Sequence, residues 1–227
     1  GLCISPRQAV TITVNPGPTA PVIGSNSSIC VGSTLNLTSN TIGGATYAWT
    51  GPVSFTSSLE DPSRPTVTAA MAGTYSCAVT IAGCTSAAAT TSVTINTPSV
   101  APTSITGTTT ICDGVSTTLT LNGGSAGTGA TAEWYTSSCG GTPAGSGNSI
   151  TVSPSSNTTY YVRYEGVCNT TTCASQLVTV NAIPIIDAGT NTEICLGQFT
   201  STIGGSPTAT GGDGSSYSYV WDNGVVD

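Results

Sequence analysis

The sequence repeats itself at an interval of about 83 residues, and this period limits the fold more than any other feature. The pattern Ile-Cys-x-Gly occurs three times, with its cysteines at Cys30, Cys112 and Cys195. These cysteines are 82 and 83 residues apart. One tryptophan follows each copy of the pattern: Trp49, Trp134 and Trp221. Two markers that share one period indicate a tandem array of a small structural unit.

Proline-bearing segments predict where the units begin and end. They follow three short strands that each end in Asn, at 10–15, 93–96 and 178–181. Proline stiffens a connection and prevents the preceding strand from continuing, and we expect Pro184 to act in this way after the third strand. We therefore expect four parts: the closing strand of a preceding repeat at 1–16, whole repeats at 17–97 and 98–182, and the opening part of a further repeat at 183–227. We also expect the natural polypeptide to continue in both directions.

Within each unit the apolar residues alternate with Thr, Ser and Asn. Leu35 and Leu37 fall on one face of a strand, and the segment 75–81 places four side chains inward. Paired glycines, such as those at 43–44 and 123–124, mark turns between strands. No segment has the period of an amphipathic helix. About seven short strands in roughly 85 residues predict an all-β fold, a series of two-sheet sandwiches.

The composition excludes two classes of partner. Charged residues make up 6% of the chain, against about 25% in an average protein. Lys and His are absent, and the formal net charge is −7. We therefore expect no nucleic-acid binding, since phosphate contacts need clustered basic side chains. We also expect no membrane insertion, because no apolar run approaches the ~18 residues that would span a bilayer.

Nine cysteines without His or a Cys-x-x-Cys spacing indicate disulfides and an oxidising compartment. The sequence offers no catalytic constellation either, because a serine triad would lack its base. The acids are mostly isolated, and the adjacent pair Glu60-Asp61 fits a solvated turn beside Pro62 better than a catalytic dyad. We therefore predict that the chain is not an enzyme, with no catalytic, cofactor-binding or dedicated metal site.

The sequence leaves two possibilities open for the surface: calcium binding between repeats and N-glycosylation. Calcium between repeats would use oxygen ligands, for which the candidates are Asp187, Asp213 and Asp222, although their spacing forms no EF-hand loop. N-glycosylation sequons occur at four asparagines: Asn26, Asn36, Asn157 and Asn169.

Some residues resemble those of immunoglobulin folds. In the segment 72–77, Tyr75 lies two residues before Cys77, as in a tyrosine-corner strand, and Trp49 takes the place of the core tryptophan. The resemblance implies a core around five aromatic residues: Trp49, Tyr75, Trp134, Tyr160 and Trp221. The second strand has Leu35 and Leu37 where antibody domains have a cysteine. We therefore expect Cys77 to be a buried free thiol, with a Cys30–Cys77 bridge as the alternative.

A closer resemblance combines the Ile-Cys-x-Gly opening, the tryptophan, the Gly-Thr-Tyr strand and a late Gly-Cys. These features resemble the immunoglobulin-like or PKD-like tandem repeats of very large Bacteroidetes surface proteins secreted by the type IX system. Gliding-motility adhesins of the SprB kind are among them. The resemblance extends over essentially the whole chain. It implies a secreted protein on the cell surface that acts as a structural stalk or filament of an adhesin.

Alignment of the repeats on Thr-Tyr then predicts the disulfides. The expected pairs are Cys30–Cys84, Cys112–Cys168 and Cys139–Cys173, with Cys112–Cys173 and Cys139–Cys168 as the alternative for the second repeat. Cys3 and Cys195 are expected to pair with cysteines outside this sequence. A bridge that closes about 55 residues would stabilise a thin β-sandwich by about 4 kcal/mol.

Two further functions remain as alternatives to the stalk. In the first, the chain is a self-assembling fibre in which the strand at 10–15 completes a sheet of the next subunit. In the second, it is an accessory binding module of a secreted carbohydrate-active enzyme. Neighbouring repeats are the expected partners in all cases. Lateral or end-to-end self-association is also expected, because a weakly charged surface repels its copies little. The sequence does not indicate the adhesion ligand.

Overall fold

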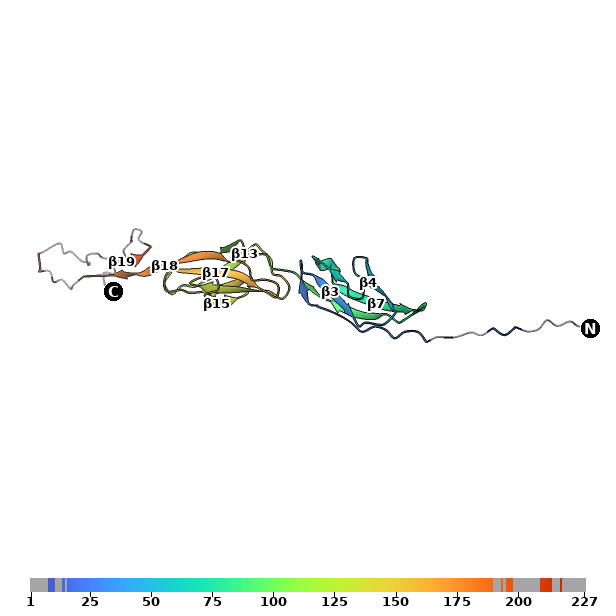
Figure 1. The fold of residues 1–227 in the computed structure, drawn as a ribbon. Helices are drawn as coiled ribbons and strands as arrows, with labels where there is room; N and C mark the ends of the chain where they lie inside the picture. The colour runs from blue at the N-terminus through green and yellow to red at the C-terminus, as the bar shows by residue number, and fades with distance from the viewer. Residues whose placement is uncertain are drawn as a thin grey trace, which may run out of the picture. The chain divides into compact units, whose positions relative to one another are not determined.

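The computed structural model describes residues 8–10, 14, 16–189, 193, 195–197, 209–213 and 217. In this part of the chain the regular structure is β-strand, apart from one short 3-10 turn. The prediction of an all-β fold is confirmed. The chain divides into two compact units, at 1–98 and 99–227, and Figure 1 labels some of the strands of each. Cys3, Trp221 and Asp222 lie outside the described residues.

Unit 1 contains two sheets and one separate strand pair. The first sheet has the order β1 (Ile23–Ser25), β3 (Leu35–Ser39) and β6 (Ser63–Arg64). The second has the order β5 (Phe55–Ser57), β4 (Thr46–Gly51), β7 (Gly73–Ile81) and β8 (Cys84–Thr85), and β9 (Ala89–Val93) also pairs with β7. The separate pair is β2 (Ile29–Cys30) with β10 (Ile95–Asn96), and the 3-10 turn η1 (Ala69–Met71) precedes β7.

Alternation along the strands builds the core of unit 1. Leu35 and Leu37 point inward from β3, while Trp49 and Tyr75 point inward from β4 and β7. Each of these four side chains is no more than 1% exposed. The remaining buried members of the cluster are Tyr47, Val67, Cys77, Val79, Val93 and Ile95. The core therefore lies between the two sheets, as in a β-sandwich.

Unit 2 repeats this plan. Its first sheet has the order β11 (Ser104–Thr106), β13 (Thr117–Asn122) and β16 (Ser149–Val152). Its second has the order β12 (Thr110–Cys112), β18 (Ala174–Ile186), β17 (Thr158–Glu165), β14 (Thr131–Thr136) and β15 (Thr142–Ser146), and β19 (Ala209–Gly212) also pairs with β18. Trp134 is fully buried and Tyr160 is 5% exposed. The Trp134 indole donates a hydrogen bond from Nε1 to the Gly147 carbonyl at 2.8 Å.

The last strand of unit 2 differs from the prediction. Pro184 was expected to end the closing strand, yet β18 runs through it to Ile186 and pairs with β19. The register shifts between Ala182 and Ile185, so Pro184 lies in an irregularity of the ladder. Proline is tolerated at such a position because no ladder N–H is needed there. The strand therefore continues where a joint was expected.

Candidate functional site

The two units share one arrangement at their terminal strands. In unit 1, β2 and β10 run parallel, with Cys30 opposite Asn96. The Val31 amide donates to the Asn96 carbonyl at 2.9 Å. The side chains of Ser27 and Ser28 add two contacts, because the Thr94 amide donates to Ser27 Oγ at 2.8 Å and the Asn96 amide group donates to Ser28 Oγ at 3.1 Å. Backbone and side-chain bonds thus join an early strand to a late one.

Unit 2 has the equivalent pair. β12 lies parallel to β18, with Thr110 opposite Thr179 and Cys112 opposite Asn181. The Thr179 amide donates to the Thr109 carbonyl at 2.8 Å, and the Asp113 amide donates to the Asn181 carbonyl at 2.9 Å. We call the β2–β10 and β12–β18 pairs the parallel clamps.

The strand direction in these clamps decides how they respond to tension. When the two ends of a unit are pulled apart, an early strand and a late strand that run parallel are drawn past each other along their own axes. All the hydrogen bonds between them then carry load together, whereas a peeled hairpin breaks its bonds one at a time. The two strands of each parallel clamp would therefore be sheared, and not peeled apart, by a pull on the ends of the unit.

One disulfide lies within unit 2. Cys139, in the turn between β14 and β15, is bonded to Cys173, directly before β18, with S–S 1.97 Å and Cα–Cα 5.9 Å. The bond closes a sequence separation of 34 residues. In the chain-entropy model a loop of this length stabilises the fold by roughly 4 kcal/mol. It ties the outer hairpin of the sheet to the start of its longest strand.

The other expected pairs are wrong. Cys84 and Cys112 are free thiols, whereas Cys30 and Cys168 are each half of a disulfide. Neither Cys30–Cys84 nor Cys112–Cys168 is therefore formed. The alternative pairs, Cys112–Cys173 and Cys139–Cys168, are excluded by the Cys139–Cys173 bond. The Cys30–Cys77 alternative is wrong as well, because Cys77 is a free thiol.

Strand direction explains the failure in unit 2. Cys112 lies opposite Asn181 on β18, while Cys168 is in the turn that leads into the beginning of that strand. Asn181 is eight residues beyond Cys173, which corresponds to about 26 Å of extended strand. A disulfide requires Cα atoms within about 7 Å of each other. Cys112 and Cys168 therefore lie at opposite ends of the sandwich.

The same separation holds in unit 1. Cys84 lies opposite Ile81, at the end of β7, whereas Val93 lies opposite Gly73 at the start of that strand. About 26 Å of β7 separates these two levels. Cys30 is beside Asn96, three residues beyond Val93. Cys30 and Cys84 are therefore also at opposite ends.

Cys77 acts as an apolar core residue. It lies directly opposite Trp49 in the β4–β7 ladder and is fully buried. Burial raises the pKa of its thiol, while a hydrogen bond with the Ala48 backbone lowers it to a lesser extent. In unit 2 the equivalent position opposite Trp134 is held by Val162, which is also fully buried. The thiol thus occupies a site that a valine fills in the next repeat.

Tyr75 anchors the corner before β7. Its hydroxyl donates to the Met71 carbonyl at 2.9 Å and accepts a hydrogen bond from Arg64 Nη1 at 2.7 Å. The Arg64 guanidinium also lies over the Phe55 ring, 4.7 Å from its centroid. Gly51 is required beneath the Tyr75 ring, because a Cβ there would lie 2.4 Å from a ring carbon.

A second polar cluster lies on the outer face of unit 2, and the sequence analysis missed it. Arg163 contacts Glu165 through Nη2 at 2.6 Å and Nε at 2.8 Å, and the Tyr135 hydroxyl donates to the same carboxylate. The hydrogen bond from Tyr135, followed by that from Arg163, lowers the pKa of Glu165. The bond to Glu165 raises the pKa of Tyr135. The spacing of Arg163 and Glu165 could have indicated this pair, because residues two apart on a strand lie on the same face of the sheet.

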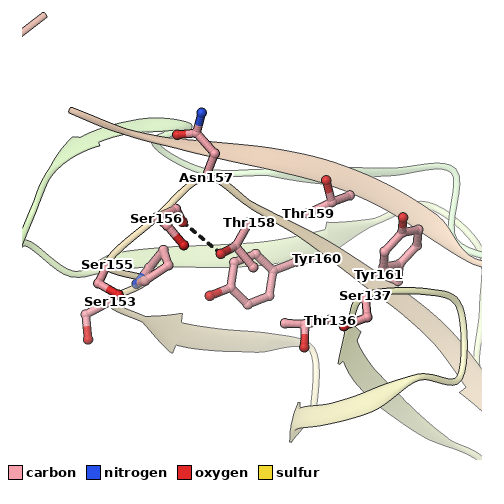
Figure 2. A pocket seen from close by; sticks show the side chains of 11 residues that line it. Thr136, Ser137, Ser153, Ser155, Ser156, Asn157, Thr158, Thr159, Tyr160 and Tyr161 are labelled. Atoms are coloured by element: carbon pink, nitrogen blue, oxygen red, sulfur yellow. Dashed lines mark hydrogen bonds between the residues drawn. The ribbon is translucent and has the colours of Figure 1, made fainter. Parts of the chain in front are cut away.

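Beside this sheet is an open groove with a volume of about 660 Å³. Figure 2 shows Tyr160 and Tyr161 of β17 together with the serine-rich loop that precedes the strand. Thr158 Oγ1 donates to the Ser156 carbonyl at 2.8 Å, which holds the loop against the strand. The side chains that line the groove are neutral, and most carry hydroxyl groups. It offers hydrogen bonds but no acid or base.

The candidate acids and sequons have structural contacts. Among the described residues no three Asp, Glu, His or Cys side chains gather into a metal-binding group. Asp187 Oδ1 accepts a hydrogen bond from the Gly189 amide at 2.8 Å, and Asp61 Oδ1 accepts one from the Ser39 amide at 2.8 Å. The expected calcium ligand Asp213 is in the turn after β19.

The side chains of three of the four sequon asparagines are hydrogen-bonded to backbone groups. Asn26 Oδ1 accepts from the Asn36 amide at 2.8 Å, and Asn157 Oδ1 accepts from the Val180 amide at 2.8 Å. Asn169 accepts from the Ser99 amide at 2.8 Å and donates to the Ser99 carbonyl at 2.9 Å. In the described part of the chain no helix is long and apolar enough to cross a membrane.

Both sandwiches have the immunoglobulin-like fold, with the tryptophan core and, in unit 1, the tyrosine corner of that class. Residues 98–184 match the family model described as an Ig-like domain, CHU_C associated. The second repeat is therefore an Ig-like repeat domain.

Comparison with solved structures agrees on the fold. The I67–I69 fragment of the titin I-band is 12% identical, with a TM-score of 0.52 over 72% of this chain and 67% of that chain. A complex of a mouse coronavirus receptor-binding domain with its murine receptor is 16% identical, with a TM-score of 0.53 over 70% and 99%. The N-terminal eight Ig domains of Down syndrome cell adhesion molecule are 14% identical, with a TM-score of 0.53 over 70% and 24%. No curated protein sequence matches the chain.

Proposed function

We propose that this chain is a non-catalytic structural segment, a stalk or filament, of a large adhesin on the outer surface of a cell. Its repeats provide length and resistance to tension, while adhesion is located elsewhere in the parent protein. The repeat pattern further suggests a type IX-secreted surface protein of the gliding-motility adhesin kind. Neighbouring repeats of the same chain are its main partners.

The parallel clamps carry this proposal. Each unit joins an early strand to a late strand in the direction that loads all their hydrogen bonds together. A second observation supports it: the disulfide Cys139–Cys173 fits an oxidising, extracellular location. The boundaries at 1–16, 17–97, 98–182 and 183–227 are part of the proposal.

Single-molecule pulling of the reduced full chain tests the mechanical role. Asp113→Pro removes the amide that donates to the Asn181 carbonyl, whereas Asp113→Asn keeps that donor. We expect Asp113→Pro to lower the unfolding force of unit 2 and leave unit 1 unchanged. The matched Asn variant should behave like the original chain. Equal unfolding forces for all three proteins would contradict the role of the clamp.

Location is tested separately. An antibody raised against residues 17–182 should label intact cells of the source organism, and brief protease treatment of those cells should remove the label. Labelling that requires permeabilised cells would contradict the surface proposal without affecting the mechanical one.

One observation favours a second candidate, the accessory carbohydrate-binding module. The groove beside Tyr161 is neutral and rich in hydroxyl groups, as suits a weakly bound sugar. Titration with neutral oligosaccharides, followed by NMR, tests it. Shifts confined to the groove and lost in Tyr161→Ala would support binding, while unchanged spectra would exclude this second candidate.

A further inference from the structure

One edge of the Arg163 guanidinium lies beside the Cys139–Cys173 disulfide of unit 2. Its Nη1 is 3.9 Å from Cys139 Sγ, whereas Nε and Nη2 bind the Glu165 carboxylate at 2.8 and 2.6 Å. Nε and Nη2 form the opposite edge of the planar guanidinium. The carboxylate is therefore on the far side of the cation, and the sulfur faces the positive group.

Two further contacts fix the guanidinium in this position. It lies over the Tyr135 ring, 5.2 Å from the ring centroid. It also lies against Gly140, where a Cβ would be 2.9 Å from both Nη1 and Nη2. Gly140 has a φ of +79°, which side chains rarely adopt. The turn that carries Cys139 therefore leaves the space in which the cation of Arg163 is held.

The other titratable groups on this face of the sheet cannot replace Arg163. Strand register and alternation place two acids and two phenols on it: Glu133, Glu165, Tyr135 and Tyr161. Glu133 is directly opposite Arg163 in the β14–β17 ladder, and its carboxylate accepts a hydrogen bond from Thr131 Oγ1 at 2.8 Å. The two acids oppose a further negative charge. Any stabilisation of a thiolate here must come from Arg163, the single basic residue of unit 2.

The two sulfur-bearing residues differ in their surroundings. Cys139 is exposed and contacts the cation, while Cys173 is partly buried. A neighbouring guanidinium favours the thiolate form of a cysteine. In thiol–disulfide exchange, the sulfur that forms the more stable thiolate leaves more readily. Arg163 therefore favours Cys139 as the leaving sulfur and Cys173 as the sulfur that is attacked.

We propose that the Cys139–Cys173 bond is a thiol-exchange site, at which a low-molecular-weight thiol bonds to Cys173 and displaces Cys139 as a thiolate that Arg163 stabilises. The attacking thiolate forms an S–S bond with Cys173 Sγ. The electron pair of the broken bond goes to Cys139 Sγ. One disulfide replaces another, so the step needs no oxidant.

The exchange would change how far unit 2 can be stretched. The intact bond closes a sequence separation of 34 residues, which a pull on the chain cannot extend. Opening the bond would add roughly 120 Å of chain. It would also free the β14–β15 turn from the start of β18. The proposal goes beyond the stalk function, because it assigns a site of covalent modification to the repeat.

Reduced glutathione is a suitable probe for the full oxidised chain. Acid stops the exchange, and mass spectrometry of peptic peptides then locates the bound glutathione. We expect its ratio, Cys173-bound over Cys139-bound, to rise with pH as the Cys139 thiolate forms. A tenfold gain in the acidity of Cys139 gives roughly a fivefold rise between about pH 6.5 and about pH 8.5. A purely steric preference would give a constant ratio, which would overturn the proposal.

Two substitutions form a matched pair for the same measurement. Arg163→Gln removes the cation, and we expect the ratio to lose its rise with pH. Tyr135→Phe keeps both the cation and the ring beneath it, and the ratio should rise as in the original chain. A rise of the same size in Arg163→Gln would overturn the proposal.

Hydrogen exchange checks that the modified repeat keeps the geometry on which the proposal rests. Peptides from β17, which carries Arg163, should stay protected in the original chain after glutathione has bound to Cys173. Loss of that protection would mean that Cys139 no longer faces the cation. The bond would then act as a structural staple alone, and the proposal would be wrong.

Discussion

Arg64 and Tyr75 are joined by a hydrogen bond of 2.7 Å, from the guanidinium to the phenol oxygen, at the corner where the chain enters β7. The same hydroxyl donates to the Met71 carbonyl. Because Tyr75 is fully buried, its hydroxyl gives the corner a fixed position within the apolar core. This pair distinguishes unit 1 from unit 2, where the equivalent Tyr160 lies at the groove of Figure 2.

Removal of this hydroxyl should weaken unit 1. We expect Tyr75→Phe to lower its free energy of unfolding by about 1–3 kcal/mol, because a carbonyl and a guanidinium lose their buried partner. Hydrogen exchange resolved by peptide measures the two units separately. Tyr160→Phe is the control and should have a smaller effect on unit 2. An equal loss in both variants would contradict the role of Arg64 and Met71.

Replacement of Cys77 by an apolar residue should change the stability of unit 1 little, whereas replacement by a polar residue should lower it. We expect Cys77→Val to change the stability of unit 1 by less than about 1.5 kcal/mol, because Val162 fills the equivalent site. Cys77→Ser should cost about 1–3 kcal/mol, since it buries a hydroxyl in an apolar core. Denaturant unfolding of the two variants compares them. Similar losses for Val and Ser would contradict an apolar site.

The raised pKa of the Cys77 thiol predicts how the stability of unit 1 depends on pH. The folded state holds the thiol proton more tightly than the unfolded state. Stability is therefore unaffected below the ordinary thiol pKa of about 8.5 and falls as the pH rises above it, while the unfolded thiol ionises. Unfolding measured from about pH 7 to about pH 10 should show this loss in the original chain. The loss should be smaller in Cys77→Val.

Glu165 should contribute to the stability of unit 2 with the opposite dependence on pH. Its pKa is lowered in the folded state by Tyr135 and Arg163, so its contribution is present above the ordinary carboxyl pKa of about 4.3 and is lost as the pH falls through the folded value. The group is 35% exposed, so solvent keeps the effect below about 1 kcal/mol. NMR titration of Glu165 should give a pKa below the usual range that rises in Tyr135→Phe. An unchanged value in that variant would contradict the assigned cause.

Removal of the Cys139–Cys173 bond should destabilise one unit only. We expect Cys139→Ser/Cys173→Ser to lower the free energy of unfolding of unit 2 by roughly 4 kcal/mol, through the freedom regained by the unfolded chain. Unit 1 should keep its hydrogen-exchange protection. A comparable loss of protection in both units would show that the bond acts on more than its own repeat.

The strands and the core could be predicted because they depend on local patterns. Alternation placed Leu35, Leu37 and Trp49 in the core of unit 1, and each is buried. The predicted Cys139–Cys173 pair is formed, but the states of Cys30, Cys84, Cys112 and Cys168 could not be predicted in this way. Alignment compares positions along the chain, whereas the end of the sandwich that a cysteine reaches depends on β2 and β12 running parallel to the last strands. That direction depends on tertiary packing and leaves no mark near Cys30 or Cys112.

The Cys139–Cys173 bond has a consequence for damage to the backbone. Arg163, the single basic residue of unit 2, lies inside the closed loop. A trypsin-like protease that cut there would leave both pieces covalently joined. The repeat would be nicked but not severed, and its two halves would separate only after a reductant had reached the sulfur atoms.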